Sequence, residues 1–231
     1  MLLDSHSEVC SPPEIALRDL VVNPRSKYAE RTLKEIALDA QQLEYVLWDW
    51  VLQRELEESG KRMLVKKTPS DVFLVDRIVE CWPDARFIFL LRHPGAIARS
   101  RQALRPQDSP ERNAKMVHRY GEALEDARRR YPGLTVKYED LTADSAAVTR
   151  EVCEFLGLEW EPEMLDYGRY GHGRLRAGLG DWKEKIRTGE VLEAEPPPRA
   201  EEIPPELLRL CSAWGYSVEG AAAPAAASAP E

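Results

Sequence analysis

Arg92 and Ser100 are the two residues whose types and spacing point most directly to chemistry. Arg92 follows the apolar run FIFLL of residues 87–91 and precedes His-Pro-Gly, and Ser100 lies eight residues further on. A guanidinium and a hydroxyl both donate hydrogen bonds to phosphate oxygens. If the turn between them folds back, the pair could bind one compact anion such as a phosphate. The alternative that the spacing leaves open is an exposed arginine and a serine on a helix surface.

The elements on either side of Arg92 would place it at a ligand-binding edge. The unbroken apolar run 87–91 predicts a strand covered on both faces, and Pro94 predicts the start of a helix that continues to about Leu104. In open parallel sheets, ligands bind beyond the carboxyl ends of the strands. Arg92 stands at that end of its predicted strand.

The remaining pattern alternates helices and strands. Apolar spacing predicts a helix over 29–56 that ends at Gly60, and Thr68-Pro69 predicts the capped start of a helix that Pro83 ends. Four further elements are expected: a short strand over 62–66, a helix over 113–130, a strand over 134–138 and a helix over 145–156 closed by Gly157. This alternation predicts an α/β fold, a three-layer sandwich around a central parallel sheet.

Length and charge narrow the class of protein. The 231 residues are enough for one core of ordinary size, and the net charge of −8 argues against bulk electrostatic binding to nucleic acid or to anionic membranes. Residues 86–130 nevertheless hold eleven Lys and Arg against five Asp and Glu. This segment could therefore bind a compact anion while the chain as a whole stays acidic.

The cysteines and the two ends of the chain give further expectations. The four cysteines form no Cys-x-x-Cys pair, so we expect no metal site, no disulfide and a reducing interior. No apolar run approaches the roughly 20 residues of a membrane helix, and the first ten residues do not resemble a signal peptide. The expected location is the cytoplasm. We expect one domain over 1–217 and a disordered Ala/Pro-rich tail over 218–231.

Five segments resemble the sulfotransferases that use 3′-phosphoadenosine-5′-phosphosulfate. RFIFLLRHPGAIARS, residues 86–100, is similar to the family's 3′-phosphate-binding strand, Arg-x-Pro turn and helix. VKKTPS resembles its Lys-x-Pro segment, and LTVKYEDL resembles its Tyr-Glu-Asp-Leu strand. RAGLGDWKEKI is similar to the Gly-x-Gly-Asp-Trp loop that closes over the nucleotide, and LLDSHSEVCSPPE to the segment after the first helix. The resemblance covers about residues 1–190 and implies a P-loop NTPase-like sulfotransferase fold.

The resemblance also implies how the donor nucleotide, 3′-phosphoadenosine-5′-phosphosulfate, would be bound as co-substrate without a metal. The implied contacts are Arg92 and Ser100 with the 3′-phosphate, Tyr138 with the adenine, and Arg176, Gly178 and Gly180 in a loop around the 3′-phosphate. In that loop the arginine stands one residue nearer to Gly-Asp-Trp than in the family's Arg-Lys-Gly form.

Two further residues match catalytic positions of the family. Sulfuryl transfer needs in-line positioning, a cation at the bridging oxygen and often a base for the acceptor's proton. By the match to Lys-x-Pro, Lys67 would supply the cation, with Lys66 as its competitor because adjacent strand residues point to opposite sides. Glu14, which closes Ser-Pro-Pro-Glu, would be the base. Other family members use a histidine, so four alternatives, each with a structural interpretation, are His6, His93, His118 and His172.

One departure from the family pattern concerns the phosphosulfate loop. No Gly-rich stretch of the Arg-Ser-Gly-Thr type precedes LLDSHSE. We therefore expect a domain without the N-terminal strand and loop that hold the 5′-phosphosulfate through backbone N–H groups in the family.

The leading hypothesis is a sulfotransferase that acts on a hydroxyl or amine of a small-molecule or carbohydrate acceptor. The alternative is a truncated or degenerate relative that binds only the 3′-phosphate nucleotide or a protein partner. A P-loop kinase is disfavoured because the motif G-x-x-x-x-G-K-[ST] is missing too.

Overall fold

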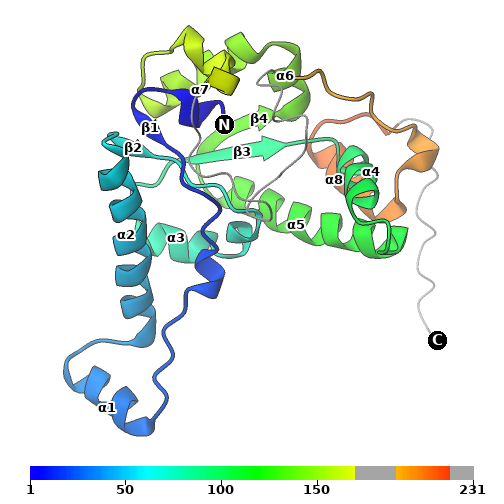
Figure 1. The fold of residues 1–231 in the computed structure, drawn as a ribbon. Coiled ribbons are helices and arrows are strands. Elements are labelled where there is room, and N and C mark those ends of the chain that lie inside the picture. The colour runs from blue at the N-terminus through cyan, green and yellow to red at the C-terminus, as the bar shows by residue number, and fades with distance from the viewer. Residues whose placement is uncertain (170–190, 219–231) are drawn as a thin grey trace, which may run out of the picture. The chain divides into compact units, whose positions relative to one another are not determined.

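A computed structural model of the chain describes residues 1–169 and 191–218. The chain forms two compact units, each assembled from separate stretches of the sequence. Unit 1 comprises residues 1–85 and 157–192, and unit 2 comprises residues 86–156 and 193–231. Figure 1 labels their helices and strands. The tail predicted over 218–231 lies, apart from its first residue, outside the described residues.

Unit 1 is built around a short parallel sheet and one long helix. β1 (Val9–Cys10) pairs with β2 (Met63–Leu64) in parallel. The helices of this unit are α1 (Lys27–Glu35), α2 (Ala40–Ser59) and α3 (Val75–Cys81), with short 3₁₀ helices over Leu3–Ser5, Leu17–Asp19, Pro69–Phe73, Pro162–Leu165 and Tyr167–Arg169. Trp48 of α2 is fully buried and donates a hydrogen bond from Nε1 to the Leu20 carbonyl at 2.8 Å. This contact anchors α2 on the segment that follows β1.

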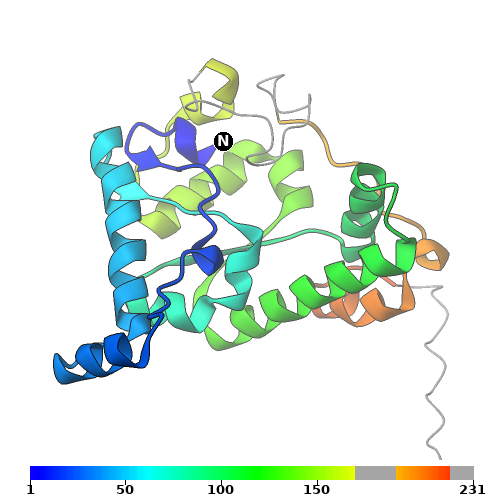
Figure 2. The same ribbon diagram turned by 60° about the horizontal axis from the view of Figure 1, so that its bottom comes forward.

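The prediction of one continuous helix over 29–56 is wrong, because two helices form there. Ala37 adopts φ +56° in the left-handed region, which interrupts the helical path. Asp39 then starts α2 with a capping box: its carboxylate accepts from Gln42 N at 2.8 Å, and the Gln42 side chain accepts from Asp39 N at 2.9 Å. In Figure 1 and Figure 2, α1 lies beyond the N-terminal end of α2. The predicted end at Gly60 is confirmed, with φ +65° at that residue.

The helix predicted from Thr68-Pro69 also differs from the structure. Pro69 starts the 3₁₀ helix Pro69–Phe73, and the α-helix begins only at Val75. The Thr68 hydroxyl caps neither element, because it donates to the Ile15 carbonyl at 3.1 Å. Thr68 therefore joins the segment after β2 to the segment after β1.

Unit 2 has a two-stranded parallel sheet with helices on both sides. β3 (Phe87–Leu91) pairs with β4 (Gly133–Lys137) over five residues, from Phe87 opposite Gly133 to Leu91 opposite Lys137. Its helices are α4 (Pro94–Leu104), α5 (Pro110–Arg130), α6 (Tyr138–Ala143), α7 (Ser145–Leu156) and α8 (Leu208–Ala213), with 3₁₀ helices over Ala200–Glu202 and Pro205–Leu207. Figure 1 and Figure 2 show α6 and α7 on one side of β3 and β4 and α5 on the other.

The core of unit 2 joins its central strand to its last helix. The buried cluster consists of Leu91, Ala98, Val117, Ile203, Leu207, Leu210, Cys211 and Trp214. These side chains come from β3, α4, α5 and the C-terminal segment, so residues 203–214 complete a core that β3 and α5 begin. Burial of this apolar surface is the main term that holds the four segments together.

Around the expected ligand site, the sequence predictions agree closely with the elements. The strand over 87–91 and the helix from Pro94 to Leu104 are confirmed. The prediction that both faces of this strand are covered is wrong at Leu90, whose side chain is 51% exposed while Phe89 and Leu91 are buried. The strand predicted to reach residue 138 ends one residue earlier, because Tyr138 already begins α6.

The fold class is α/β with parallel strand pairing, as predicted. Within the described residues the strands pair as two separate parallel sheets, one in each unit. None of the helices in these residues has both the length and the apolar character that crossing a membrane requires.

Candidate active site

In unit 2, the carboxyl ends of β3 and β4 bring Arg92 and Tyr138 together. Leu91 and Lys137, the last residues of the two strands, are partners in the parallel register, so Arg92 and Tyr138, which follow them, emerge at the same end of the sheet. The Arg92 guanidinium stacks over the Tyr138 ring at 4.6 Å from its centroid. The candidate phosphate-binding cation and the candidate adenine-contacting ring therefore share one end of the sheet.

Arg92 is half-buried at the end of β3. Within residues 1–169 and 191–218, its guanidinium forms no ion pair with a carboxylate. Ser100 is half-buried two turns into α4, the helix that the Arg92 turn starts. Arg92 follows β3 and Ser100 lies on α4, the next element, and the joint binding of one phosphate by the two side chains stays a prediction.

His93 closes the turn between Arg92 and α4. Its Nδ1 accepts hydrogen bonds from Gly95 N at 3.1 Å and Ala96 N at 3.3 Å, so the imidazole is the N-cap of α4. Because Nδ1 accepts, the neutral ring carries its proton on Nε2. Burial lowers the pKa of His93, which favours this neutral, capping form. His93 is thus a structural part of the turn, which the sequence left as an alternative to a catalytic role.

Glycine is required at position 95 by close packing. A Cβ on Gly95 would lie 2.8 Å from Pro198 Cγ and 3.2 Å from the His93 ring. The turn Arg92-His93-Pro94-Gly95 therefore packs directly against the C-terminal segment of unit 2. Sequence reasoning used Pro94 for the helix start and the Arg-x-Pro motif but gave Gly95 no role.

Glu139 connects three segments of unit 2 through hydrogen bonds to its carboxylate. Its Oε1 accepts a hydrogen bond from His93 N at 3.0 Å, and its Oε2 accepts one from the Tyr216 hydroxyl at 2.6 Å. The Tyr216 ring meets the edge of His93 at 5.0 Å between centroids, and Lys137 Nζ lies 4.8 Å from the Tyr216 ring centroid. Sequence reasoning missed Glu139 and Tyr216, although Glu139 lies inside the Tyr-Glu-Asp-Leu motif that it quoted.

In unit 1, the ends of β1 and β2 bring Glu14 and Lys67 together. Cys10 and Leu64 are partners in the parallel register, so the residues that follow each strand emerge at the same edge. There Lys67 Nζ donates to Glu14 Oε1 in an ion pair. The Lys67 side chain is 65% exposed and that of Glu14 is 28% exposed, so both groups are accessible. The candidate cation and the candidate base, 53 positions apart in the chain, are direct neighbours.

Lys66, the competitor of Lys67, has other hydrogen-bonding partners. Its ammonium pairs with Asp71 and donates to Thr68 Oγ1 at 3.0 Å, and the Lys66 and Asp71 side chains are 11% and 14% exposed. Burial lowers the pKa of Lys66 and raises the pKa of Asp71, while their mutual attraction opposes both shifts. Lys66 is therefore committed to an internal ion pair, which leaves Lys67 as the accessible lysine of Lys-Lys-Thr-Pro.

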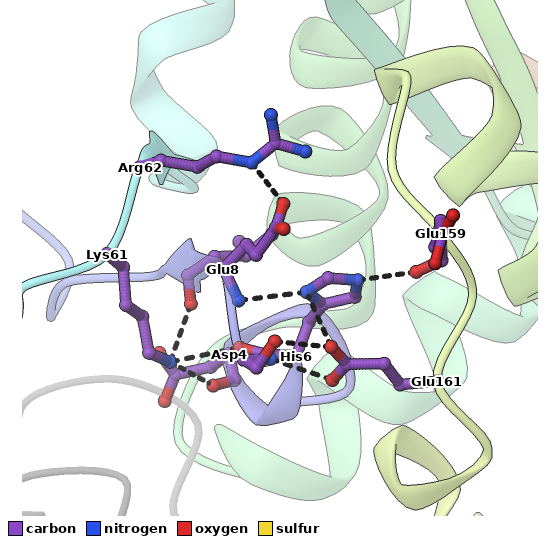
Figure 3. A network of polar contacts seen from close by, with 9 residues as sticks. Asp4, His6, Glu8, Lys61, Arg62, Glu159 and Glu161 are labelled. Atoms are coloured by element: carbon purple, nitrogen blue, oxygen red, sulfur yellow. Dashed lines mark hydrogen bonds and ion pairs between the residues drawn. The ribbon is translucent and has the colours of Figure 1, made fainter.

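His6 lies in a polar network that secures the segment before β1 (Figure 3). Its Nδ1 accepts from Glu8 N at 3.0 Å, so the proton resides on Nε2, which donates to the Glu159 carbonyl at 2.8 Å. Beside it, Lys61 Nζ donates to the carbonyls of Asp4, His6 and Val9 at 2.8, 3.1 and 2.8 Å. With both ring nitrogens engaged and the side chain buried, His6 is a structural residue of unit 1.

The remaining candidates fall in two groups. His118 lies on α5 with Nε2 at 3.7 Å from Glu122 Oε1, one helical turn away. Outside the described residues lie His172, Arg176, Gly178 and Gly180. Within the described ranges, no three His, Cys, Asp or Glu side chains gather in a way that could hold a metal ion.

A family model described as "Sulfotransferase family" matches residues 1–162. This range contains Glu14, Lys67, Arg92, Ser100 and Tyr138, whereas Tyr216 lies beyond it. Nodulation protein NoeE of Sinorhizobium fredii (strain NBRC 101917 / NGR234) is 31% identical over 110 residues, a match that covers 43% of this chain and 26% of NoeE. The chain therefore aligns with about a quarter of that relative's length.

Two solved structures are similar over nearly the whole chain. The sulfotransferase domain from the curacin biosynthetic pathway has a TM-score of 0.63 and 19% identity, with 94% of this chain and 92% of that domain covered. The sulfotransferase domain from the Synechococcus PCC 7002 olefin synthase has a TM-score of 0.64 and 21% identity, with 94% and 88% covered. At these identities the likeness establishes the fold.

Proposed function

The chain belongs to the sulfotransferase family, and on that premise we propose that it moves the sulfuryl group of 3′-phosphoadenosine-5′-phosphosulfate to a hydroxyl or amine of a small-molecule or carbohydrate acceptor. The observation that carries the proposal is the ion pair between Lys67 and Glu14 at the common edge of β1 and β2. It places a cation and a carboxylate, the two groups that sulfuryl transfer uses, within contact of each other.

The roles follow from the charges that change during transfer. The acceptor oxygen or nitrogen attacks sulfur while the bond from sulfur to the bridging phosphate oxygen breaks, so negative charge grows on that oxygen. The Lys67 ammonium would stabilise this charge, and the Glu14 carboxylate would take the proton that the acceptor loses. The products are the sulfated acceptor and adenosine 3′,5′-bisphosphate. In the ligand-free chain the two side chains neutralise each other.

Donor binding is assigned to unit 2. Arg92 would hold the 3′-phosphate with Ser100, and Tyr138 would contact the adenine. The absence of a carboxylate partner for Arg92 within the described residues supports this role, because an ion pair would compete with the phosphate. The stacking on Tyr138 keeps the guanidinium at the sheet edge without neutralising it.

Calorimetry with adenosine 3′,5′-bisphosphate tests donor binding. We expect Arg92→Ala to weaken binding by about 1.5–3 kcal/mol, the scale of a charge-assisted hydrogen bond. Arg105→Ala is the matched control, because Arg105 is an exposed arginine just after α4. A chain that does not bind the nucleotide, or that binds it equally well after Arg92→Ala, contradicts the proposal.

Transfer itself is tested with ³⁵S-labelled donor and a panel of phenols, sugars and amines. We expect Glu14→Gln to lower kcat by about 10²–10⁴-fold, the usual contribution of a general base, and Lys67→Ala by about 10²–10³-fold. Adenosine 3′,5′-bisphosphate should still bind both variants, because neither residue is assigned to the 3′-phosphate. Unchanged turnover in both variants would remove these roles. Nucleotide binding without transfer to any acceptor would favour a relative that only binds the nucleotide.

A further inference from the structure

We propose that Glu139 is a positioning residue for the phosphate-binding turn, and that Tyr216, from the segment after α8, completes this arrangement. The inference rests on the proposed function, because it concerns the same Arg92. It extends the donor site to a C-terminal residue that lies outside the range matched by the family model.

The carboxylate of Glu139 has a partner on each oxygen. His93 N donates to Oε1 at 3.0 Å, and the Tyr216 hydroxyl donates to Oε2 at 2.6 Å. The three residues belong to the turn before α4, the first turn of α6 and the segment after α8. A single side chain therefore holds together three segments that are distant in the sequence.

The bond to His93 N acts directly on the orientation of Arg92. That N–H belongs to the planar peptide that joins Arg92 to His93, so holding it restricts the backbone rotation of Arg92. On the other side, the β3–β4 ladder holds Leu91 opposite Lys137. The backbone of Arg92 is thus fixed from both sides, and only its side-chain torsions remain to be set by the stacking on Tyr138.

Arg92 and the residues that hold its turn make separate side-chain contacts. The Arg92 guanidinium contacts the Tyr138 ring, whereas the His93 ring and Lys137 Nζ contact the Tyr216 ring. Glu139 and Tyr216 therefore contact the turn through His93.

The hydrogen bond between Tyr216 and Glu139 has the properties of a stable structural contact. A hydrogen bond to a carboxylate is shorter and stronger than one between neutral groups. Burial and the adjacent Glu139 carboxylate raise the pKa of Tyr216, so its hydroxyl remains a donor throughout the working pH range. The ring packs between His93 and Lys137, which restricts its rotation.

The test must separate positioning from general stabilisation. It compares the affinities of the full chain for adenosine 3′,5′-bisphosphate and adenosine 5′-monophosphate, which differ in the 3′-phosphate. The ratio of the two affinities measures how much the 3′-phosphate contributes to binding. A variant that only loosens the fold weakens both ligands alike and leaves the ratio unchanged. A variant that misplaces Arg92 lowers the ratio.

We expect Glu139→Ala to reduce this ratio by about tenfold, corresponding to about 1.4 kcal/mol, and Tyr216→Phe to reduce it by a smaller factor. Glu139→Gln should keep most of the ratio, because its amide oxygen can still accept from His93 N while its amide group donates to Tyr216. Glu151→Ala, an exposed glutamate on α7, is the control.

The outcomes distinguish this inference from the proposed function. If the wild-type chain shows no preference for the bisphosphate, both fail. If Arg92→Ala abolishes the preference while Glu139→Ala preserves it, the inference is overturned and the donor site stands. If Glu139→Ala fails to fold, Tyr216→Phe provides the test. A reduced affinity ratio in Tyr216→Phe supports the positioning role of Glu139 and Tyr216, and an unchanged ratio overturns it. Equal losses in Glu139→Gln and Glu139→Ala would also overturn it, because the hydrogen bonds would then not be the cause.

Discussion

Two adjacent lysines, Lys66 and Lys67, differ in burial, and their substitution should change stability by very different amounts. We expect Lys66→Ala to lower the free energy of unfolding by about 3 kcal/mol, because it leaves Asp71 as a buried charge without its partner. Lys67→Ala should change it by no more than about 0.5 kcal/mol, because the pair with Glu14 is exposed. Urea denaturation of the two variants checks this, and equal losses would show that Lys66 is not internal.

His93 should make stability depend on pH in a defined direction. Its pKa is lowered in the folded chain, mainly by burial and in part by Arg99, while Glu139 opposes the shift. The unfolded chain therefore binds the proton more readily, and stability present above about pH 6.5 is lost as the pH falls toward the lowered folded pKa. His93→Asn keeps a cap acceptor without this titration. Urea melts at about pH 7.5 and about pH 5.5 should show a larger loss in the wild type than in the variant.

At the scale of elements, the pairing of β3 with β4 depends on Gly133. A Cβ at this position would lie 2.5 Å from the Phe87 carbonyl oxygen and 2.6 Å from the Phe89 ring. A backbone atom cannot move aside as the end of a side chain can. We therefore expect Gly133→Ala to lower the free energy of unfolding by about 1–3 kcal/mol. Gly60 has φ +65°, and a Cβ there would have nothing within 4 Å. Gly60→Ala should therefore lower the free energy of unfolding by about 1 kcal/mol through backbone conformation alone. Thermal denaturation compares the two variants. A smaller loss of stability in Gly133→Ala than in Gly60→Ala would contradict the close approach of β3 and β4 at Gly133.

For the whole molecule, the order of residues in the chain does not follow the order in space. Unit 2 takes its last core residues from 203–214, whereas residues 157–169, which precede them in the chain, belong to unit 1. The range matched by the family model ends at residue 162, yet Leu207, Leu210 and Trp214 are buried in the core that supports β3. The candidate catalytic pair belongs to unit 1 and the Arg92 turn to unit 2.

The sequence by itself determined the elements around Arg92. An unbroken apolar run and a proline at the first helical position are local signals, so the strand 87–91, the helix 94–104 and the position of Arg92 between them could be read directly. The motifs in order also identified the family. Local periodicity was misleading over 29–56, because a capping box at Asp39 overrides an apolar stripe that continues through it.

Only the tertiary structure decided which of these residues meet. Lys67 reaches Glu14 across 53 positions because parallel strands end at the same edge, and Tyr216 reaches Glu139 across 77 positions because α8 packs into the core beneath β3. The choice between Lys66 and Lys67 depended on which of the two lysines is buried with its partner. Such contacts arise from the path of the chain in space, and no local pattern of residues encodes them.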